Sequence, residues 1–364
     1  MRDVIVALVF ISFLLGCSDS EKDSNFTLID VPVKTAKEIK LSTVAISVDS
    51  IALETLDNNL LNRISEIEHD EQSIFIADID ALFKFSRNGK FIKQIGNKGQ
   101  GPGEYLNIND ITLDRKRNHI YVASGISQKI ICFDLEGKFV KESKIIGLNA
   151  IKVVNGSLHG IFTTYGMPSA DKTKWIHNSY LVKFDQYFSP SDTILIKSVK
   201  MDKGTGTSVG RPGDQLLSEV NGSLYVYLNE TYKEPFVRDT LFQIKDKKRL
   251  ASLKLNFGIE DRLKENLFVQ SILRTENHLV IDFSVERYSG MSIVHLPTNR
   301  TYIGKEFFQD DFWNTGSAKL MPWDLNNEEF YFIKEGMELV DKFDGVTGEE
   351  NPYIFIVKLK TDSF

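Results

Sequence analysis

The chain has 364 residues, of which 42% are hydrophobic and 11% aromatic, and its formal net charge is −6 at pH 7. The excess charge is small and acidic, which argues against a nucleic-acid-binding protein with a basic surface. Only two cysteines are present, so neither a disulfide framework nor a cysteine-based metal site is expected.

Residues 1–16 are predicted to form a signal peptide. Arg2 gives a positive start, and residues 4–15 are almost wholly apolar. This run is too short to span a bilayer comfortably, which favours an export signal over a transmembrane helix. Gly16-Cys17 follows where cleavage is expected and resembles the lipobox of bacterial lipoproteins, in which the cysteine is acylated. A plain signal peptide with an incidental Cys17 is the alternative.

Residues 17–43 are predicted to form a flexible tether. The sequence Ser-Asp-Ser-Glu-Lys-Asp-Ser-Asn directly after Cys17 is polar and has no periodicity. Early acidic residues in such a tether resemble the surface-export signal of Bacteroidetes lipoproteins. We therefore expect an outer-membrane lipoprotein of the cell envelope, whose domain faces either the periplasm or the cell surface.

Two stretches of the following domain repeat one another. Residues 74–93 and residues 120–141 each read as an alternating strand, a second strand, a tight turn and a third strand. The turn is Asn88-Gly-Lys-Phe91 in the first copy and Glu136-Gly-Lys-Phe139 in the second. The two copies are offset by 46 to 48 residues. A strand repeat with a period of roughly 40–50 residues is typical of propeller blades.

Four further units keep the strand pattern without the turn chemistry. They are rich in Phe, Tyr, Val and Ile within short runs, as packed strands require, and they cover residues 149–197, 216–257, 268–307 and 316–359. The predicted fold is therefore all-β, a six-bladed β-propeller over residues 44–364. We expect residues 44–53 to pair with residues 353–359 and so close the ring.

The first unit resembles an NHL repeat. The resemblance is carried, in chain order, by Ile74-Phe-Ile-Ala-Asp78, Leu82-Phe-Lys-Phe85, Asn88-Gly-Lys-Phe91 and the Gly-Pro-Gly segment of residues 96–105. With the lipobox, the chain is similar to the six-bladed β-propeller lipoproteins of Bacteroides-like bacteria. The specific resemblance covers residues 47–143. It implies the fold and a location in the cell envelope, and it implies no settled activity.

The central channel of the predicted propeller is the first place to look for a site. Glu66, Asp110, Glu219 and Lys319 fall on the expected innermost strands and are candidates to face the channel. Lactonase-type propellers hold a metal on this axis with acidic and amide side chains from different blades. A solvated channel lined by mixed polar residues is the alternative.

A long insert at residues 165–178 is the second candidate. It carries Trp175, and a loop longer than a turn on a propeller face is a usual place for ligand contact. Trp175 either stacks on a sugar or a peptide aromatic, or holds the loop in place.

Three other motifs have a structural interpretation. The Gly-rich residues 96–103 lack the Gly-Lys-Ser/Thr that a phosphate loop needs, and we expect a crossover between blades. Asp78 and Asp80 lie two residues apart, and we expect Asp78 to cap a turn. The acidic residues 324–335 have the spacing of a Ca²⁺ loop without its central glycine, and we expect a hairpin turn.

The predicted function is that of a lipid-anchored, exported propeller that binds a protein, peptide or glycan partner in the cell envelope, without a cofactor and without nucleic acid. No Gly-x-Ser-x-Gly or His-Glu-x-x-His motif occurs, so no catalytic residue is assigned. The alternative is a metal-dependent, lactonase-like hydrolase or a lyase at the axial channel, with Ca²⁺ as its candidate metal. A purely structural envelope lipoprotein is a third hypothesis.

Overall fold

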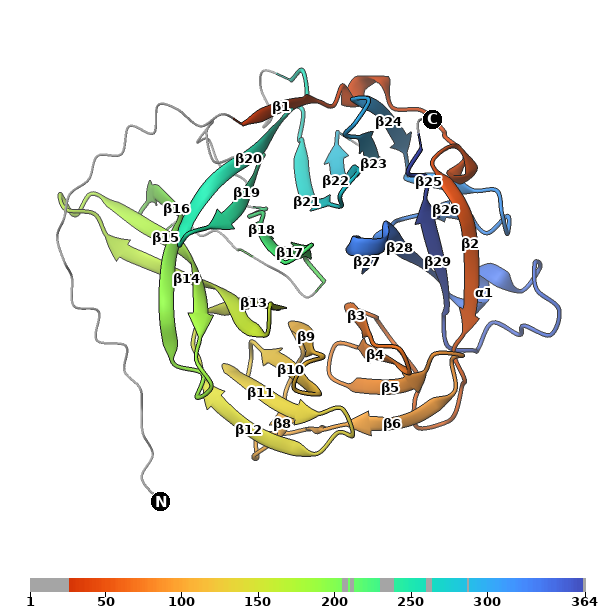
Figure 1. The fold of residues 1–364 in the computed structure, drawn as a ribbon, viewed down its shortest axis with the longest axis horizontal. Coiled ribbons are helices and arrows are strands. Elements are labelled where there is room, and N and C mark those ends of the chain that lie inside the picture. The colour runs from red at the N-terminus through yellow and green to blue at the C-terminus, as the bar shows by residue number, and fades with distance from the viewer. Residues whose placement is uncertain are drawn as a thin grey trace.

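The described part of the chain forms a ring of sheets around a central axis (Figure 1). The computed structural model describes residues 26–204, 209, 213–229, 239–259, 264–286 and 288–362. Within these residues, six sheets each contribute four consecutively paired strands, and one of them carries a fifth strand on its outer edge. The predicted all-β, six-bladed β-propeller is confirmed.

The first three blades follow one another in sequence. Blade 1 contains β3 (Glu66–His69), β4 (Ser73–Ala77), β5 (Leu82–Ser86) and β6 (Phe91–Ile95). Blade 2 contains β9 (Asp110–Asp114), β10 (His119–Ser124), β11 (Lys129–Asp134) and β12 (Phe139–Lys144). Blade 3 contains β13 (Leu148–Val154), β14 (Ser157–Pro168), β15 (Lys174–Phe184) and β16 (Pro190–Asp202). In each blade the first strand lies nearest the axis (Figure 1).

The other three blades complete the ring. Blade 4 contains β17 (Leu217–Val220), β18 (Ser223–Val226), β19 (Thr240–Lys245) and β20 (Lys248–Asn256). Blade 5 contains β21 (Phe268–Arg274), β22 (His278–Val285), β23 (Tyr288–His295) and β24 (Arg300–Lys305). Blade 6 contains β27 (Met321–Asp324), β28 (Glu329–Lys334), β29 (Tyr353–Leu359) and β2 (Ala45–Ala52). A short pair, β25 (Phe308–Asp310) and β26 (Gly316–Ala318), precedes blade 6.

Helical structure is sparse in the described residues. It consists of the 3₁₀ turns η1 (Val33–Thr35), η2 (Leu41–Thr43) and η3 (Leu325–Asn327) and the single turn α1 (Gly336–Leu339). None of these helices is long and apolar enough to cross a membrane.

Alternate residues of one strand pack against two different blades. In β10, Ile120 and Val122 belong to the core shared with blade 1, whereas Tyr121 and Ala123 belong to the core shared with blade 3. Successive side chains of a strand point to opposite faces of its sheet, so an apolar strand buried on both faces needs no polar alternation. Each blade is therefore stabilised by its two neighbours, as in other repeat proteins.

The ring closes where the two ends of the propeller sequence meet. β2 pairs antiparallel with β29, in a register that places Ala52 opposite Tyr353 and Ala45 opposite Leu359. Phe355 and Val357 of β29 are fully buried. The predicted pairing of residues 44–53 with residues 353–359 is confirmed.

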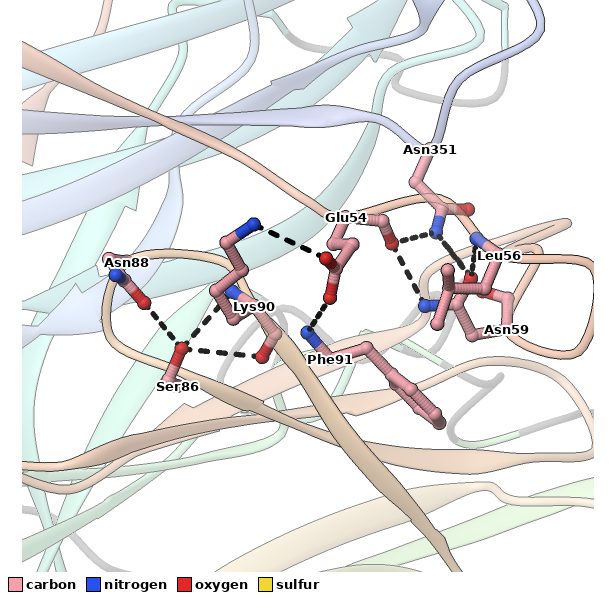
Figure 2. Close-up of polar contacts among 8 residues, drawn as sticks. All are labelled: Glu54, Leu56, Asn59, Ser86, Asn88, Lys90, Phe91 and Asn351. Carbon is pink, nitrogen blue, oxygen red and sulfur yellow. Dashed lines mark hydrogen bonds and ion pairs between the residues drawn. The ribbon is translucent and has the colours of Figure 1, made fainter.

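The segment after β2 joins blade 6 to blade 1 through buried amides (Figure 2). The Nδ2 of Asn351 donates to the backbone oxygens of Glu54 at 3.0 Å and Asn59 at 3.1 Å, and the Nδ2 of Asn59 donates to the same Glu54 oxygen at 2.9 Å. The Glu54 carboxylate accepts from the Phe91 N–H at 2.9 Å and pairs with Lys90. The chain is thereby fixed at the junction where the ring closes.

The repeated Gly-Lys-Phe turns are structural, as predicted. Gly89 and Gly137 have φ values of 83° and 81°, which favour glycine. A Cβ on Gly89 would lie 2.0 Å from the Ala52 backbone oxygen. In the first copy the side chain of Ser86 accepts a hydrogen bond from the Lys90 N–H (Figure 2). In the second copy the side chain of Asp134 accepts one from the Lys138 N–H.

The Gly-rich segment of residues 96–103 is a crossover between blades 1 and 2, again as predicted. Its ends form the parallel pair β7 (Asn97–Lys98) and β8 (Glu104–Tyr105). Tyr105 is fully buried, and its hydroxyl donates to the Ile95 oxygen at 2.6 Å and accepts from the Leu82 N–H at 3.0 Å. A Cβ on Gly96 would lie 2.7 Å from the Tyr105 ring.

The prediction of a tether over residues 17–43 is wrong from residue 27 onward. β1 (Thr27–Asp30) pairs in parallel with β20 and extends blade 4 outward, and Val31, Val33 and Leu41 are fully buried. The alternation of apolar residues from Leu28 to Val33 is the signal for this strand. Residues 17–25, the predicted signal peptide and Cys17 lie outside the described residues.

The predicted long loop at residues 165–178 is a strand extension. β14, β15 and β16 have 12, 11 and 13 residues, and their outer halves project from the ring as a hairpin (Figure 1). Trp175 lies in this extension, opposite Pro168 on β14 and Met201 on β16.

Removal of residues 355–364 is expected to abolish folding. It deletes most of β29, which lies between β2 and β28, and leaves two open sheet edges in place of a closed ring. Circular dichroism should then show no cooperative melting. A truncated protein that melts like the intact chain would contradict the closure.

Candidate functional site

A cavity of about 1130 Å³ opens at one end of the central channel. Its wall combines the inner strands of blades 1, 2, 3, 4 and 6 with the turn between β3 and β4 and the turn between β11 and β12. The charged and amide residues of this wall that lie on or beside the inner strands include Glu66, Glu68, Lys152 and Gln215. Because each comes from a strand or strand end next to the axis, the ring itself sets their positions.

An acidic cluster lies at the inner end of the cavity. Glu66 and Glu68 alternate on β3 and share one face of that strand, and both are buried. The Nζ of Lys152 on β13 pairs with the Oε1 of Glu68 at 2.8 Å. The Nε2 of Gln215, just before β17, donates to the Oε2 of Glu66 at 2.6 Å. Three blades thus meet at this cluster.

Asp110 on β9 interacts electrostatically with Glu66 and does not line the cavity. Its Oδ2 accepts from the Ile151 N–H at 2.8 Å. Burial raises the pKa of Asp110 to about 7, although the bond from Ile151 and the charge of Lys152 oppose the shift. Burial, together with the charge of Asp110, raises the pKa of Glu66 well above its usual value. Burial therefore favours the protonated form of these two carboxyl groups, which outnumber the one lysine beside them.

Lys152 remains charged in this setting. Burial alone lowers the pKa of a lysine, but the charges of Glu68 and Glu66 outweigh it and hold the pKa of Lys152 above its usual value. The same two carboxylates, added to burial, raise the pKa of Tyr331.

The whole cavity carries an excess of negative charge. Nine of its lining residues are acidic and four are lysine or arginine. The acidic ones are Glu66, Glu68, Asp70, Glu71, Asp134, Glu136, Glu219, Asp324 and Glu329, and the basic ones are Lys84, Arg87, Arg115 and Lys152. A concave wall of one sign concentrates ligands of the opposite charge.

The tryptophan in the cavity wall is already covered. The His69 ring stacks on Trp323 with centroids 4.2 Å apart, and the Arg87 guanidinium lies 5.1 Å from the centre of the Trp323 ring. Only 8% of Trp323 is exposed. Its ring face is therefore not offered to a sugar or an aromatic ligand.

The sequence-predicted site residues do not form one group. Glu66 and Asp110 come together as described. Glu219 lies at the rim of the same cavity, where it accepts hydrogen bonds from the Gly222 N–H and from the Asn326 side chain. Lys319 lines a separate cavity of about 240 Å³. Trp175 is half-buried on the blade 3 hairpin and lines neither cavity.

Sequence reasoning missed four residues that the fold places in the channel. Glu68 had a signal, because it alternates with Glu66 on a short strand. Lys152 and Asp282 also had one, since each is a charged residue with apolar neighbours on both sides within a strand. Gln215 had none, because only the closed ring brings it to Glu66.

The two acidic motifs have the structural roles that were predicted for them. Asp78 accepts hydrogen bonds from the N–H groups of Asn62, Arg63 and Ile79. Asp80 pairs with Lys98 and so does not form a paired-carboxylate site with Asp78. Residues 324–327 form a turn in which Asp324 accepts from the Asn326 N–H at 3.1 Å.

Among the described residues, no group of three or more His, Cys, Asp and Glu side chains is arranged to hold a metal ion. In the acidic cluster, Glu68 instead pairs with Lys152, and Glu66 accepts a hydrogen bond from Gln215. The structure therefore gives no support to the metal-dependent hydrolase alternative.

Residues 26–358 match the family described as a domain of unknown function, DUF4934. The chain belongs to the DUF4934 family. The fold of this DUF4934 chain is similar to that of a Bacteroides fragilis "Putative exported protein", with a TM-score of 0.66, 18% identity and coverage of 92% of this chain and 100% of that one. It also resembles a DUF4221 family member from Bacteroides vulgatus, with a TM-score of 0.51, 11% identity and coverage of 87% and 97%. No curated protein matches the chain.

The Asp110→Asn variant is expected to be more stable than the parent near pH 8 by about 1–3 kcal/mol, because it removes a buried charge and keeps the acceptor for Ile151. A raised pKa means that Asp110 contributes stability in full below about pH 4 and loses it as the pH rises through about 7. The difference between variant and parent should therefore vanish near pH 4.

Urea unfolding at several pH values measures this difference. The exposed Asp57, changed to Asn, is the matched control and should show no such trend. An Asp110→Asn variant that is destabilised equally at every pH would refute the electrostatic account of this residue.

Proposed function

We propose that this chain is an exported, lipid-anchored propeller of the cell envelope that binds a basic segment of a partner protein or peptide in its acidic axial cavity. The observation that carries the proposal is the surplus of carboxylates in a cavity built jointly by five blades.

The electrostatics of the cavity favour a cationic ligand. Burial raises the pKa values of Glu66 and Asp110, and neighbouring carboxylates raise them further. A lysine or arginine side chain that enters the cavity supplies the missing charge and favours the ionised carboxylates. A positively charged ligand is therefore expected to bind more tightly than a neutral one at this point of the channel.

The size of the cavity favours a peptide segment. Its volume of about 1130 Å³ lies just above the range for small-molecule pockets, roughly 300–1,000 Å³, and is far larger than one ion needs. Propeller cavities of this kind are rigid, because the ring fixes each wall.

A peptide partner is also favoured over a glycan. Sugar recognition commonly uses an open aromatic face, and Trp323 is covered by His69 and Arg87. Trp175, the other candidate, lies on the hairpin and away from the cavity. Binding of a glycan is therefore an alternative result of the binding experiment below and is not what we propose.

Export and lipidation are supported by the N-terminal sequence. The apolar run of residues 4–15 followed by Gly16-Cys17 has the pattern of a lipoprotein signal, as given above. The described propeller begins at β1, so a short polar segment of residues 17–26 is left to connect the lipid to the domain.

Binding of an oligolysine peptide to the purified domain tests the proposed cavity. Isothermal titration calorimetry should show binding that weakens with salt, and oligoglutamate should not bind. Glu68→Gln should weaken oligolysine binding by about tenfold, whereas Asp57→Asn should leave it unchanged. Oligolysine that binds both variants alike, or a neutral oligosaccharide that binds in its place, would overturn the proposal.

Metabolic labelling with palmitate tests the anchor. The parent should be labelled, and the Cys17→Ser variant should not be labelled and should leave the membrane fraction. Equal labelling of parent and variant would place the lipid elsewhere or exclude it.

A further inference from the structure

The blade 3 hairpin, formed by residues 164–178 and 197–203, is a basic projection on an acidic protein. The exposed charged residues of this hairpin are four lysines and two aspartates, namely Lys172, Lys174, Lys200, Lys203, Asp171 and Asp202. Asp202 pairs with Lys174. The carboxylate of Asp171 accepts from the Ser169 hydroxyl at 2.5 Å and from the Thr173 N–H at 3.0 Å. Both aspartates are thus engaged within the hairpin, which presents a net positive charge although the whole chain carries −6.

Lys172 lies at the tip of this hairpin, in the turn between β14 and β15. The turn is fixed by its own hydrogen bonds, because the Lys172 N–H donates to the Ser169 oxygen at 2.8 Å and the Ser169 N–H donates to the Lys174 oxygen at 3.0 Å. The side chain of Lys172 is exposed and makes no hydrogen bond or ion pair within the described residues. A preordered turn loses little conformational freedom when it binds, so its lysine is well placed to enter an acidic site.

Apolar side chains flank the tip. Tyr165 and Met167 on β14 are both about half exposed, and aromatic and methionine side chains are enriched at protein interfaces. β14 has 12 residues, against six in the second strand of blade 2, β10. At about 3.3 Å for each residue, β14 is therefore longer by about 20 Å, and the hairpin projects from the ring (Figure 1). It presents a cation at the end of a narrow, partly apolar arm.

The mouth of the axial cavity has the opposite charge. Glu71, in the turn between β3 and β4, is exposed and makes no ion pair within the described residues. Glu136, at the turn between β11 and β12, is also exposed. Glu66 and Glu68 follow on the inner strand β3. A cation that enters the cavity therefore meets carboxyl groups both at the mouth and inside.

The hairpin tip and the mouth of the cavity lie at opposite ends of the propeller. The cavity is lined by residues 70–72 and 134–136, at turns that join the first strand of a blade to the second and the third to the fourth. Successive turns of an antiparallel blade alternate between its two ends. The tip joins the second and third strands of blade 3, so it lies at the other end. The tip therefore faces away from the cavity of its own chain and is available to a second copy.

We propose that the hairpin tip of one copy of this chain, led by Lys172, docks in the acidic axial cavity of a second copy. This inference rests on the proposed function, because it names the basic segment that the cavity binds. The contact joins two different surfaces, so each added copy leaves one tip and one cavity free, and the assembly grows head to tail until it closes. The tip is small, so the contact is a transient one with an expected Kd of roughly 1–100 µM.

Sedimentation velocity of the purified domain in low salt measures this association. The mean mass should rise with protein concentration between about 5 and 200 µM. It should return to that of the monomer in about 0.5 M salt, or when excess oligolysine occupies the cavities. A chain that stays monomeric at every concentration while oligolysine still binds would overturn this inference and leave the proposed function standing. Assembly that excess oligolysine does not disrupt would also overturn it, and a failure of oligolysine to bind would overturn the proposed function as well.

Two charge-reversed variants locate the contact. Lys172→Glu alters the tip and Glu71→Lys alters the mouth, and each alone should weaken self-association by at least about tenfold. Lys172→Glu retains an intact cavity and Glu71→Lys retains an intact tip, so an equimolar mixture of the two should form a heterodimer with the affinity of the parent. The matched control is Lys342→Glu, in an exposed loop of blade 6, which should associate as the parent does.

All three replaced side chains are exposed, so the variants are expected to fold, and their melting curves check this. If Lys172→Glu associates as the parent does, or if the mixture of the two variants stays monomeric, the tip does not dock in the cavity and the inference is wrong.

Discussion

The antiparallel pairing of β2 with β29 is the interaction on which the rest of the propeller depends. It inserts a strand from the beginning of the domain into a blade made from its end, and the register is fixed over the length of both strands. Asn351 and Asn59 then bind the chain where it leaves β2 for blade 1. This pairing gives blade 6 its fourth strand, so that all six blades have four strands or more and the six inner strands hold their places around one channel.

That closure creates contacts that no local sequence pattern contains. Glu66 and Gln215 are 149 residues apart, and Glu68 and Lys152 are 84 residues apart, yet each pair forms a short contact across the axis. The inner strands place acidic groups of neighbouring blades side by side. The resulting acidic cluster is the physical basis for the cationic ligand proposed for the axial cavity.

Much of the fold was predictable, because the repeat, the apolar strand runs and the terminal strands are local signals that the ring only combines. The predicted tether includes β1 because this strand has only four residues and is stabilised by its distant partner β20. The sequence of the blade 3 extension predicts a loop, since Gly166 and Pro168 are typical of turns, but here both lie within a long strand. Of the site residues, Glu66 and Asp110 were predicted to face the axis, but their distances from Lys152, and the separation of Lys319, follow only from the assembled ring.

The central claim is that the axis holds more carboxyl groups than Lys152 can neutralise, so that burial keeps some of them protonated near neutral pH. Carbon-13 NMR of the carboxyl groups of labelled aspartate and glutamate, followed over pH, measures this most directly. The account predicts one aspartate carboxyl with a titration midpoint near 7 and one glutamate that stays protonated well above its usual range. A spectrum in which every carboxyl titrates below about pH 5 would contradict it.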